Sequence, residues 1–333
     1  MELSKLGLTS AARDVLELIQ PDLQLVEEEI RLQSVASVEA ITAIGRYLHS
    51  SGGKRLRPTL LLLASRLAGG GGQSAIRLAA VVEMTHAATL VHDDVIDVAE
   101  TRRGRPSTNV LWGNHTSVLA GDWLYMQAFQ VALRERNFRM LDILIGLTQM
   151  MVEGELIQLE RIGSIEVTEA DYMDLVHRKT ASLFSACARL GALSAGAGEE
   201  TESLLGDYAW NLGMAFQLVD DVLDFTADES VLGKPVGSDL REGKVTLPLI
   251  YALEKADASE RAGIETILRD ASYDSVPFSS VTALMERYRG IERAMARAEQ
   301  FTEKSRELIG SFPDSNYQRA LLALTELVTG RDH

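Results

Sequence analysis

Apolar residues recur at helical spacing along nearly the whole chain, and no segment of any length alternates apolar and polar residues as a half-buried strand does. Glycine, proline and serine interrupt the pattern at residues 50–53, 69–72 and 227–244. No shift in composition marks a domain boundary, so we predict one all-α domain spanning residues 1–333, a bundle of about ten or more helices. The predicted helices cover about residues 10–50 (with a polar break at Pro21), 58–67, 74–98, 116–135, 137–162, 168–196, 200–226, 245–256, 258–271 and further helices ending near Thr329.

Two of these predicted helices, at about 74–98 and 200–226, are apolar nearly all round and are therefore expected to be buried. Each carries the acidic pattern D-D-x-x-D, as Asp93-Asp94-Val95-Ile96-Asp97 and as Asp220-Asp221-Val222-Leu223-Asp224. The first and fifth positions share a helix face. Two carboxylates ~4 Å apart repel by roughly 4 kcal/mol at an effective dielectric constant of about 20. A hard divalent cation such as Mg²⁺, which often joins carboxylates to a substrate phosphate, is the expected counter-charge.

Further polar residues extend both acidic motifs into stripes. His86, Asp93 and Asp97 fall on one face of the first helix, and Gln217, Asp220 or Asp221, and Asp224 fall on one face of the second. Two such stripes on buried helices satisfy one another only if they face a common wet cavity. The alternative, that each motif is a solvated helix end, sets carboxylates against the helix dipole at ~0.3–1 kcal/mol apiece.

Basic residues gather in four places that suit anionic substrates. One cluster precedes a predicted helix start, where backbone N–H groups favour an anion, and others follow each acidic motif or lie within a helix. Any one of them alone is more often a solvated charge than a ligand. The groups are Lys54-Arg55-Leu56-Arg57, Arg102-Arg103-Gly104-Arg105, Arg178-Lys179-Thr180, and the pair Lys234 and Lys244.

Composition narrows the function classes. The chain has 333 residues and a net charge of −15, which gives no footprint for nucleic acid. Cys187 is the single cysteine and lies in an apolar run, so it is interpreted as a small buried side chain. The first residues show no signal-peptide pattern, and no run of 18 apolar residues indicates a membrane span. A cytoplasmic protein is expected.

Taken together, these motifs resemble those of the trans-prenyl diphosphate synthases, and the resemblance covers most of the chain. It implies an isoprenoid-synthase bundle around a central cavity, usually a homodimer, for which the helix with Trp123, Tyr125 and Phe129 is apolar enough to form an interface. The motifs are Gly52 to Pro58, Glu83 to His86, His92 to Asp97, Arg102 to Gly104, Gly121-Asp122, Lys179-Thr180, Gly213 to Asp224, Gly233-Lys234 and Asp239 to Lys244.

The resemblance also implies roles for individual residues. Two to three Mg²⁺ ions would be held by Asp93, Asp97, Asp220 and Asp224. Isopentenyl diphosphate would contact Lys54, Arg57, His86 and Arg103, and the allylic diphosphate would contact Arg102, Lys179, Gln217, Lys234 and Lys244. Ionisation of the allylic diphosphate would give a cation steadied by Thr180 and Gln217, so Lys179, Thr180, Gln217, Asp93 and Asp220 form the implied catalytic set.

Small residues precede the first acidic motif, and in this family bulky residues at such positions shorten the product. Ala88 and Thr89 are small here, and Thr85 lies one turn further from Asp93. The resemblance therefore implies a medium or long polyprenyl product, with a geranylgeranyl or farnesyl diphosphate synthase as the alternative. A terpene cyclase and a non-catalytic helical regulatory subunit are less consistent with this chain, because both would be expected to lose motifs that it retains.

Overall fold

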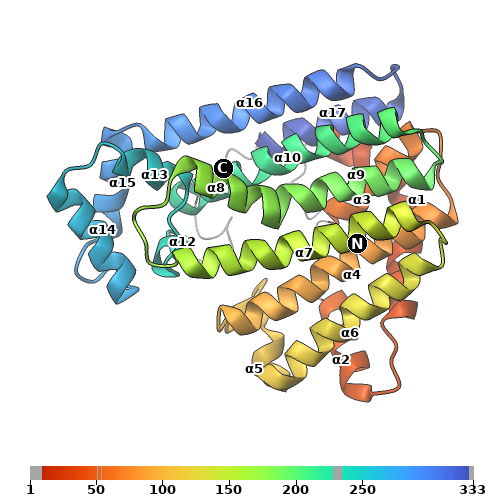
Figure 1. The fold of residues 1–333 in the computed structure, drawn as a ribbon, viewed down its shortest axis with the longest axis horizontal. Coiled ribbons are helices and arrows are strands. Elements are labelled where there is room, and N and C mark those ends of the chain that lie inside the picture. Colours follow the sequence, from red (N-terminus) through yellow and green to blue (C-terminus); the bar gives the residue numbers. More distant parts are fainter. Residues whose placement is uncertain (1–9, 51, 54, 228–234, 330–333) are drawn as a thin grey trace. The chain divides into compact units, whose positions relative to one another are not determined.

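The structure is a computed structural model that describes residues 10–50, 52–53, 55–227 and 235–329, without the side chains of 10–16 and 328–329. Lys54 and Lys234, both predicted to bind substrate, lie outside the described residues. The elements are α1 Ser10–Gln33, α2 Glu39–Ser50, α3 Leu56–Leu67, α4 Gln73–Ile96, β1 Thr101–Arg102, β2 Arg105–Pro106, α5 Thr108–Trp112, α6 Asn114–Leu133, α7 Phe138–Arg161, α8 Glu169–Val176, η2 His177–Ala181, α9 Ser182–Ser194, α10 Glu199–Thr226, α12 Ser238–Arg241, α13 Leu247–Leu253, α14 Ala258–Asp270, α15 Phe278–Arg287, α16 Gly290–Gly310 and α17 Asn316–Thr329 (Figure 1).

This order of elements confirms the predicted all-α class, with local corrections at Pro21, in the segment after α4, and at Ser238–Arg241, where α12 lies inside a stretch predicted to be irregular. The predicted break at Pro21 is wrong, because α1 runs through this residue. An internal proline costs about 3 kcal/mol, but the same helix buries an apolar stripe that includes Ile19 and Val26. The predicted loop after α4 contains a short antiparallel hairpin in which Thr101 pairs with Pro106 and Arg102 pairs with Arg105.

The chain forms two compact units, which are described separately. The first comprises residues 1–146, 184–209 and 308–324, and the second comprises 147–183, 210–307 and 325–333. The single domain predicted over residues 1–333 stays a prediction.

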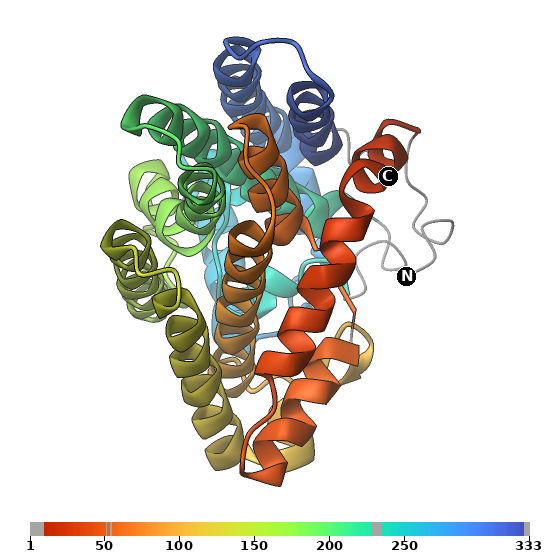
Figure 2. The same ribbon diagram turned by 90° about the vertical axis from the view of Figure 1, so that its right-hand side faces the viewer.

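In the first unit, α4 is the central element. Helices α1, α3, α5 and α6 contact it, and α1 in turn contacts α2 and α3 (Figure 2). Helix α4 has the length and hydropathy to cross a membrane, but 67% of its most apolar window is buried inside the structure. Because its apolar residues are covered by neighbouring helices, we interpret α4 as the core helix of this unit.

In the second unit, the core lies among α8, the C-terminal part of α10 and the short helices α13, α14 and α15. Its buried side chains include Val222 and Phe225 of α10, Leu247 and Ile250 of α13, and Ile267 of α14. Capping boxes at Thr168 and Asp257 begin α8 and α14. Because Val222 and Phe225 are buried in this core, the apolar side of the end of α10, which carries the second acidic motif, is fixed by packing.

Candidate active site

The first acidic motif occupies the last turn of α4, and its three carboxylates have different surroundings. Asp93 is partly exposed and Asp97, which ends the helix, is exposed, whereas Asp94 is only 2% exposed. The Nε of Arg102 donates to Asp94 Oδ1 at 2.6 Å. Burial raises the pKa of Asp94, and the charge and hydrogen bond of Arg102 oppose that rise. The motif therefore presents Asp93 and Asp97 outward and ties Asp94 inward to β1.

One glycine allows α6 to approach the first motif closely. A Cβ atom on Gly121 would lie 2.3 Å from Nε2 of His92, which is 3.0 Å from the carbonyl oxygen of Val118. His92 also lies 3.4 Å from the carboxylate of Asp122. Glycine at position 121 is therefore explained by packing, because a side chain there would clash with His92, the residue before Asp93.

A cationic cluster lies on the same unit around His86. Burial lowers the pKa of His86 well below its ordinary value, and Arg57 and Arg103 lower it further, so the ring is neutral at pH 7. Burial also lowers the pKa of Arg57, whose guanidinium carbon lies 5.7 Å from the ring centre of Phe184. The buried Nε of Arg57 has no hydrogen-bond partner in the part of the chain that is described. Such a cluster suits an anion that supplies the missing acceptors.

The loop before α3 contacts the hairpin through glycine. Arg103, at the turn between β1 and β2, donates a hydrogen bond to the Gly52 carbonyl. A Cβ atom on Gly53 would lie 2.9 Å from Nη1 of Arg103, so a side chain there would displace the guanidinium. A pocket in this unit is lined by three predicted residues, His86, Arg102 and Arg103, together with Arg55, Glu83 and Asp94.

A second pocket, in the second unit, brings together five predicted residues. It is lined by Lys179, Thr180, Gln217, Asp220 and Lys244, and also by Tyr172, Asp221 and Asp239, which were not among the predicted site residues. Lys179 and Thr180 lie in η2, a π-helical turn within the segment 168–196 that was predicted to be helical. Such turns are rare and are frequent at functional sites.

Hydrogen bonds fix the orientation of Gln217 in this pocket. Its side-chain oxygen accepts from the Thr180 hydroxyl at 2.8 Å, and its Nε2 donates to Asp221 Oδ1 at 2.7 Å. The hydroxyl of Tyr172 donates to the other oxygen of Asp221 at 2.6 Å. Burial, followed by the nearby charge of Asp239, raises the pKa of Asp221 to about 8. The buried middle aspartate thus holds Gln217 in place.

The outer aspartates of the second motif differ from each other. Asp220 is exposed and lines the pocket, whereas Asp224 is 1% exposed and is not among the lining residues described above. Asp224 accepts from the Ser238 hydroxyl at 3.1 Å and from the backbone N–H of Asp239 at 3.3 Å, and so binds the start of α12. Its predicted role as a metal ligand stays a prediction, as does the expectation that the two motifs face one cavity.

The predicted lysines of this pocket have acidic neighbours. Lys179 donates to Glu155 and, at 3.0 Å, to Gln158, both on α7. Lys244 donates to Glu242 at 2.8 Å. Gly154 explains how α7 comes near, because a Cβ atom there would lie 2.9 Å from the Lys179 side chain. An anionic ligand at either lysine therefore competes with a carboxylate.

The carboxylates suit Mg²⁺ in chemistry, although they do not form a cage. Among the residues with described placement, no three His, Cys, Asp or Glu side chains form a group able to hold a metal ion. Mg²⁺ commonly takes only one or two carboxylates, keeps several waters and completes its coordination with substrate phosphates. The exposed side chains of Asp97 and Asp220 are of the kind that this mode uses, and Mg²⁺ binding at them stays a prediction.

Fold and site together define a class of protein: an all-α protein with an acidic motif on each of two core helices and cationic pockets suited to anions. The sequence model of the family described as Polyprenyl synthetase matches residues 38–285. The chain is 39% identical over 321 residues to the octaprenyl diphosphate synthase of Haemophilus influenzae, covering 96% of this chain and 97% of the relative. It is 37% identical over 316 residues to that of Escherichia coli, covering 95% and 98%.

Solved structures agree with these relatives. A polyprenyl synthase from Caulobacter crescentus, complexed with calcium and isoprenyl diphosphate, matches with a TM-score of 0.91 and 34% identity over 97% of this chain and 98% of that one. A decaprenyl diphosphate synthase from Rhodobacter capsulatus matches with a TM-score of 0.91 and 36% identity over 97% and 99%. The chain belongs to the polyprenyl synthetase family, which confirms the predicted family and its isoprenoid-synthase fold.

Proposed function

We propose that this protein is a Mg²⁺-dependent prenyltransferase that condenses isopentenyl diphosphate with an allylic diphosphate to build an all-trans polyprenyl chain of medium or long length. The observation that carries this proposal is the pair of built pockets, one cationic around His86 and one combining Asp220 with Lys179, Thr180 and Gln217. Family membership and the octaprenyl and decaprenyl synthases among the relatives support it.

Each pocket suits one of the two substrates. Arg57 and Arg103 supply charge-assisted donors to the diphosphate of isopentenyl diphosphate, and the neutral ring of His86 adds a hydrogen bond. Lys179 and Lys244 of the second pocket supply cations to the allylic diphosphate. Arg102, which lines the first pocket, is assigned to the allylic diphosphate by resemblance only. Lys54 and Lys234 join these sets by resemblance. In this arrangement the two substrates keep separate charge partners, which sets their orientation before reaction.

The reaction itself moves few atoms. The carbon–oxygen bond of the allylic diphosphate breaks, the double bond of isopentenyl diphosphate forms the new carbon–carbon bond, and a proton leaves to the departing diphosphate. Two to three Mg²⁺ ions held by Asp93, Asp97 and Asp220, with Asp224 as a further candidate, would neutralise the developing negative charge. Gln217 is held between Asp221, to which its amide donates, and Thr180, from which its oxygen accepts, so its orientation is fixed before the substrates bind.

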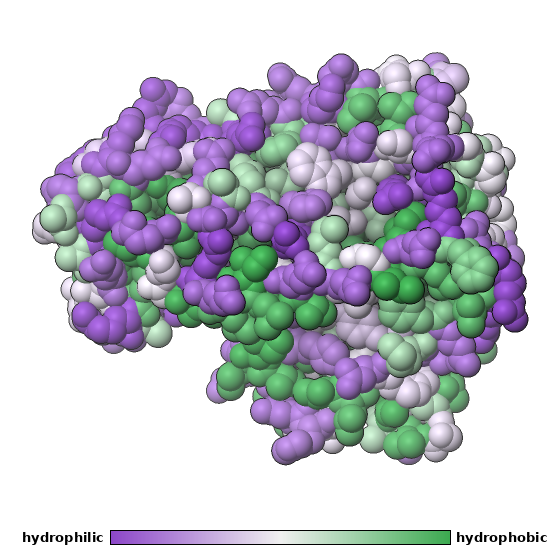
Figure 3. Space-filling model, in the orientation of Figure 1, coloured by the Kyte–Doolittle hydropathy of each residue, from purple (hydrophilic) through white to green (hydrophobic). Residues whose placement is uncertain are grey.

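An exposed apolar stripe on α6 supports the proposal of a homodimer. Leu119 and Met126, one heptad apart, are 65% and 63% exposed, and Leu133 continues the stripe. Figure 3 shows apolar residues interspersed with polar ones on one face of the molecule. Of the aromatic residues expected at this interface, Tyr125 instead packs in the core. Contiguous exposed apolar residues of this kind mark association surfaces. Sedimentation as a monomer at micromolar concentration would argue against this part of the proposal.

One assay tests the activity. The purified protein is incubated with farnesyl diphosphate, labelled isopentenyl diphosphate and Mg²⁺, and the products are separated by chain length. We expect a ladder ending in a medium or long polyprenyl diphosphate and complete loss of product with EDTA. A cyclic hydrocarbon product would indicate a cyclase. No product with any allylic primer would contradict the proposal and favour a regulatory subunit.

A further inference from the structure

Arg55, the residue between the loop and the first turn of α3, has an unusual backbone conformation. Its φ angle is 49°, in the left-handed region, and it caps α3 without a side-chain capping hydrogen bond. For a residue other than glycine this conformation is sterically unfavourable. Such a cost persists only where surrounding contacts fix the residue. The contacts of the Arg55 side chain are therefore informative.

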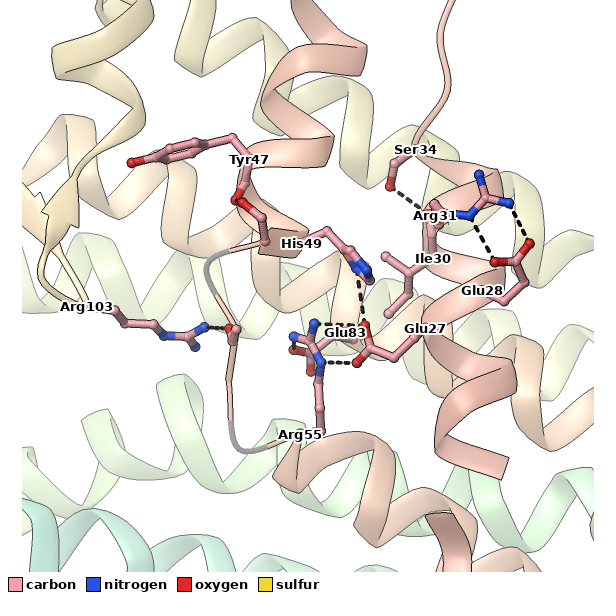
Figure 4. Close-up of polar contacts among 12 residues, drawn as sticks. Glu27, Glu28, Ile30, Arg31, Ser34, Tyr47, His49, Arg55, Glu83 and Arg103 are labelled. Carbon is pink, nitrogen blue, oxygen red and sulfur yellow. Dashed lines mark hydrogen bonds and ion pairs between the residues drawn. The ribbon is translucent and has the colours of Figure 1, made fainter. Parts of the chain in front are cut away.

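The guanidinium of Arg55 is enclosed by two carboxylates from two different helices. Its Nε and Nη2 donate to the two oxygens of Glu27 on α1, the second at 3.1 Å, and its Nη1 donates to Glu83 on α4 at 2.7 Å (Figure 4). The side chain is only 11% exposed. Nδ1 of His49, on α2, lies 3.2 Å from Glu27. A planar fork held on both sides fixes position and direction far better than a single ammonium contact would.

This arrangement places a fixed point two residues before Arg57. Arg57 is the member of the cationic cluster whose buried Nε has no hydrogen-bond partner among the described residues. Because Glu27 and Glu83 already occupy the Arg55 guanidinium, Arg55 is poorly placed to serve as a substrate ligand. Its restraint instead fixes the chain at the point where α3 begins and where Arg57 turns toward His86 and Arg103.

We propose that Arg55 is a positioning residue for isopentenyl diphosphate: the Glu27–Arg55–Glu83 network holds the start of α3 so that Arg57 is preset for the diphosphate. This inference rests on the proposed function. In this proposal Glu27 and Glu83 balance the charge of Arg55, and Arg57 and Arg103 bind the diphosphate.

The chain offers a matched control at the other end of the same helix. Arg66, in the last turn of α3, donates to Asp22 of α1 from Nε at 3.1 Å and from Nη2 at 2.7 Å. Both arginines join α3 to α1 through a carboxylate, but Arg66 lies about two and a half helical turns from Arg57. Loss of a purely structural ion pair should therefore look alike at the two sites.

The experiment compares Arg55→Gln, Arg55→Lys and Glu27→Gln with Arg66→Gln in steady-state assays that vary each substrate separately. We expect Arg55→Gln to raise KM for isopentenyl diphosphate roughly 10- to 100-fold, with KM for farnesyl diphosphate unchanged. Glu27→Gln should raise the same constant less, and Arg55→Lys should recover part of the loss. The double variant Glu27→Gln/Arg55→Gln should equal Arg55→Gln alone, because Glu27 is proposed to act only through its contact with Arg55. Arg66→Gln should move thermal stability only.

Three results would overturn the inference: equal rises in both KM values, a fall in kcat with both KM values unchanged, or an effect of Arg66→Gln equal to that of Arg55→Gln. If Arg55→Gln fails to fold, the partly exposed Glu27 provides the decisive variant. Wild-type protein without activity would instead contradict the proposed function, so the two failures are distinguishable.

Discussion

The two D-D-x-x-D motifs have the same sequence pattern but differ in which of their carboxylates are exposed. On α4 the third aspartate, Asp97, is exposed and Asp94 is buried, whereas on α10 the first, Asp220, is exposed and both Asp221 and Asp224 are buried. The middle aspartate faces inward in both, but its partner is a cation, Arg102, in the first motif and two neutral donors in the second. The identical spacing therefore sets which aspartates share a helix face. The neighbouring elements determine which carboxylates are buried and which partners they bind.

The largest expected effect comes from the outward-facing aspartates. Asp93→Asn and Asp220→Asn should each lower kcat roughly 10²- to 10³-fold, because each removes charge stabilisation from the departing diphosphate. Steady-state rates at several Mg²⁺ concentrations measure this loss. Asp142→Asn, which changes an exposed aspartate of α7, serves as the control. Wild-type kcat in Asp220→Asn would restrict the metal role to the first motif.

The next comparison concerns alanines at the same distance before each motif. Ala88 and Ala215 both lie five residues before the first aspartate, and both are fully buried. Ala88→Phe should shorten the polyprenyl product, since it would block the growing chain beside α4, whereas Ala215→Phe should overpack the core and lower stability by about 1–3 kcal/mol. Chromatography of labelled products decides, and an unchanged chain length in folded Ala88→Phe would contradict the predicted role of Thr85, Ala88 and Thr89 in setting product length.

The buried middle aspartates should differ in their dependence on a partner. Arg102→Gln leaves the Asp94 carboxylate without its cation and should cost about 1–3 kcal/mol of unfolding free energy. Tyr172→Phe removes one neutral donor from Asp221, which retains Gln217, and should cost about 1 kcal/mol. Urea denaturation measures both. Adding Asp94→Asn to Arg102→Gln should restore stability, and no restoration would mean that the pair is not the cause.

The smallest expected effect separates two roles of Asp224. If its hydrogen bonds to α12 dominate, Asp224→Asn should lower stability by about 0.5–2 kcal/mol, as the loss of a helix cap does, and should speed hydrogen exchange over residues 238–241. The Mg²⁺ concentration that gives half-maximal rate would then stay at its wild-type value. A rise in that concentration would instead establish Asp224 as a metal ligand.

Much of the fold could be predicted from sequence because helical periodicity is a local signal. The long core helices α4 and α10 follow directly from their apolar runs, and the breaks at residues 52–53 and 69–72 follow from their glycines. The continuation of α1 through Pro21 could not be predicted, because the compensating burial of Ile19 and Val26 depends on packing against distant elements. The hairpin at 101–106 has strands of two residues, too short for any alternation to appear.

Residue type alone restricts the chemistry of the outer aspartates and of the arginines near them, so these residues could be proposed for the site from the sequence. The contacts of Arg102 with Asp94 and of Tyr172 with Asp221 join residues 8 and 49 positions apart, and spacing contains no information about them. The middle aspartates offered one signal that could have been used: they point away from the outer pair on a helix already expected to be buried. The contacts of Arg55 with Glu27 and Glu83 likewise join residues far apart in the sequence, so only the structure reveals them.

The π-helical turn at His177–Ala181 has a consequence for how this protein tolerates change. A turn of this kind holds one residue more than an α-helical turn, and each residue of helix rotates the chain by about 100°. Deleting a single amino acid here would leave a regular α-helix and would rotate Lys179 away from Gln158. A deletion at this turn is therefore expected to abolish function and to leave the helix content unchanged. Most single substitutions in the same helix should have mild effects.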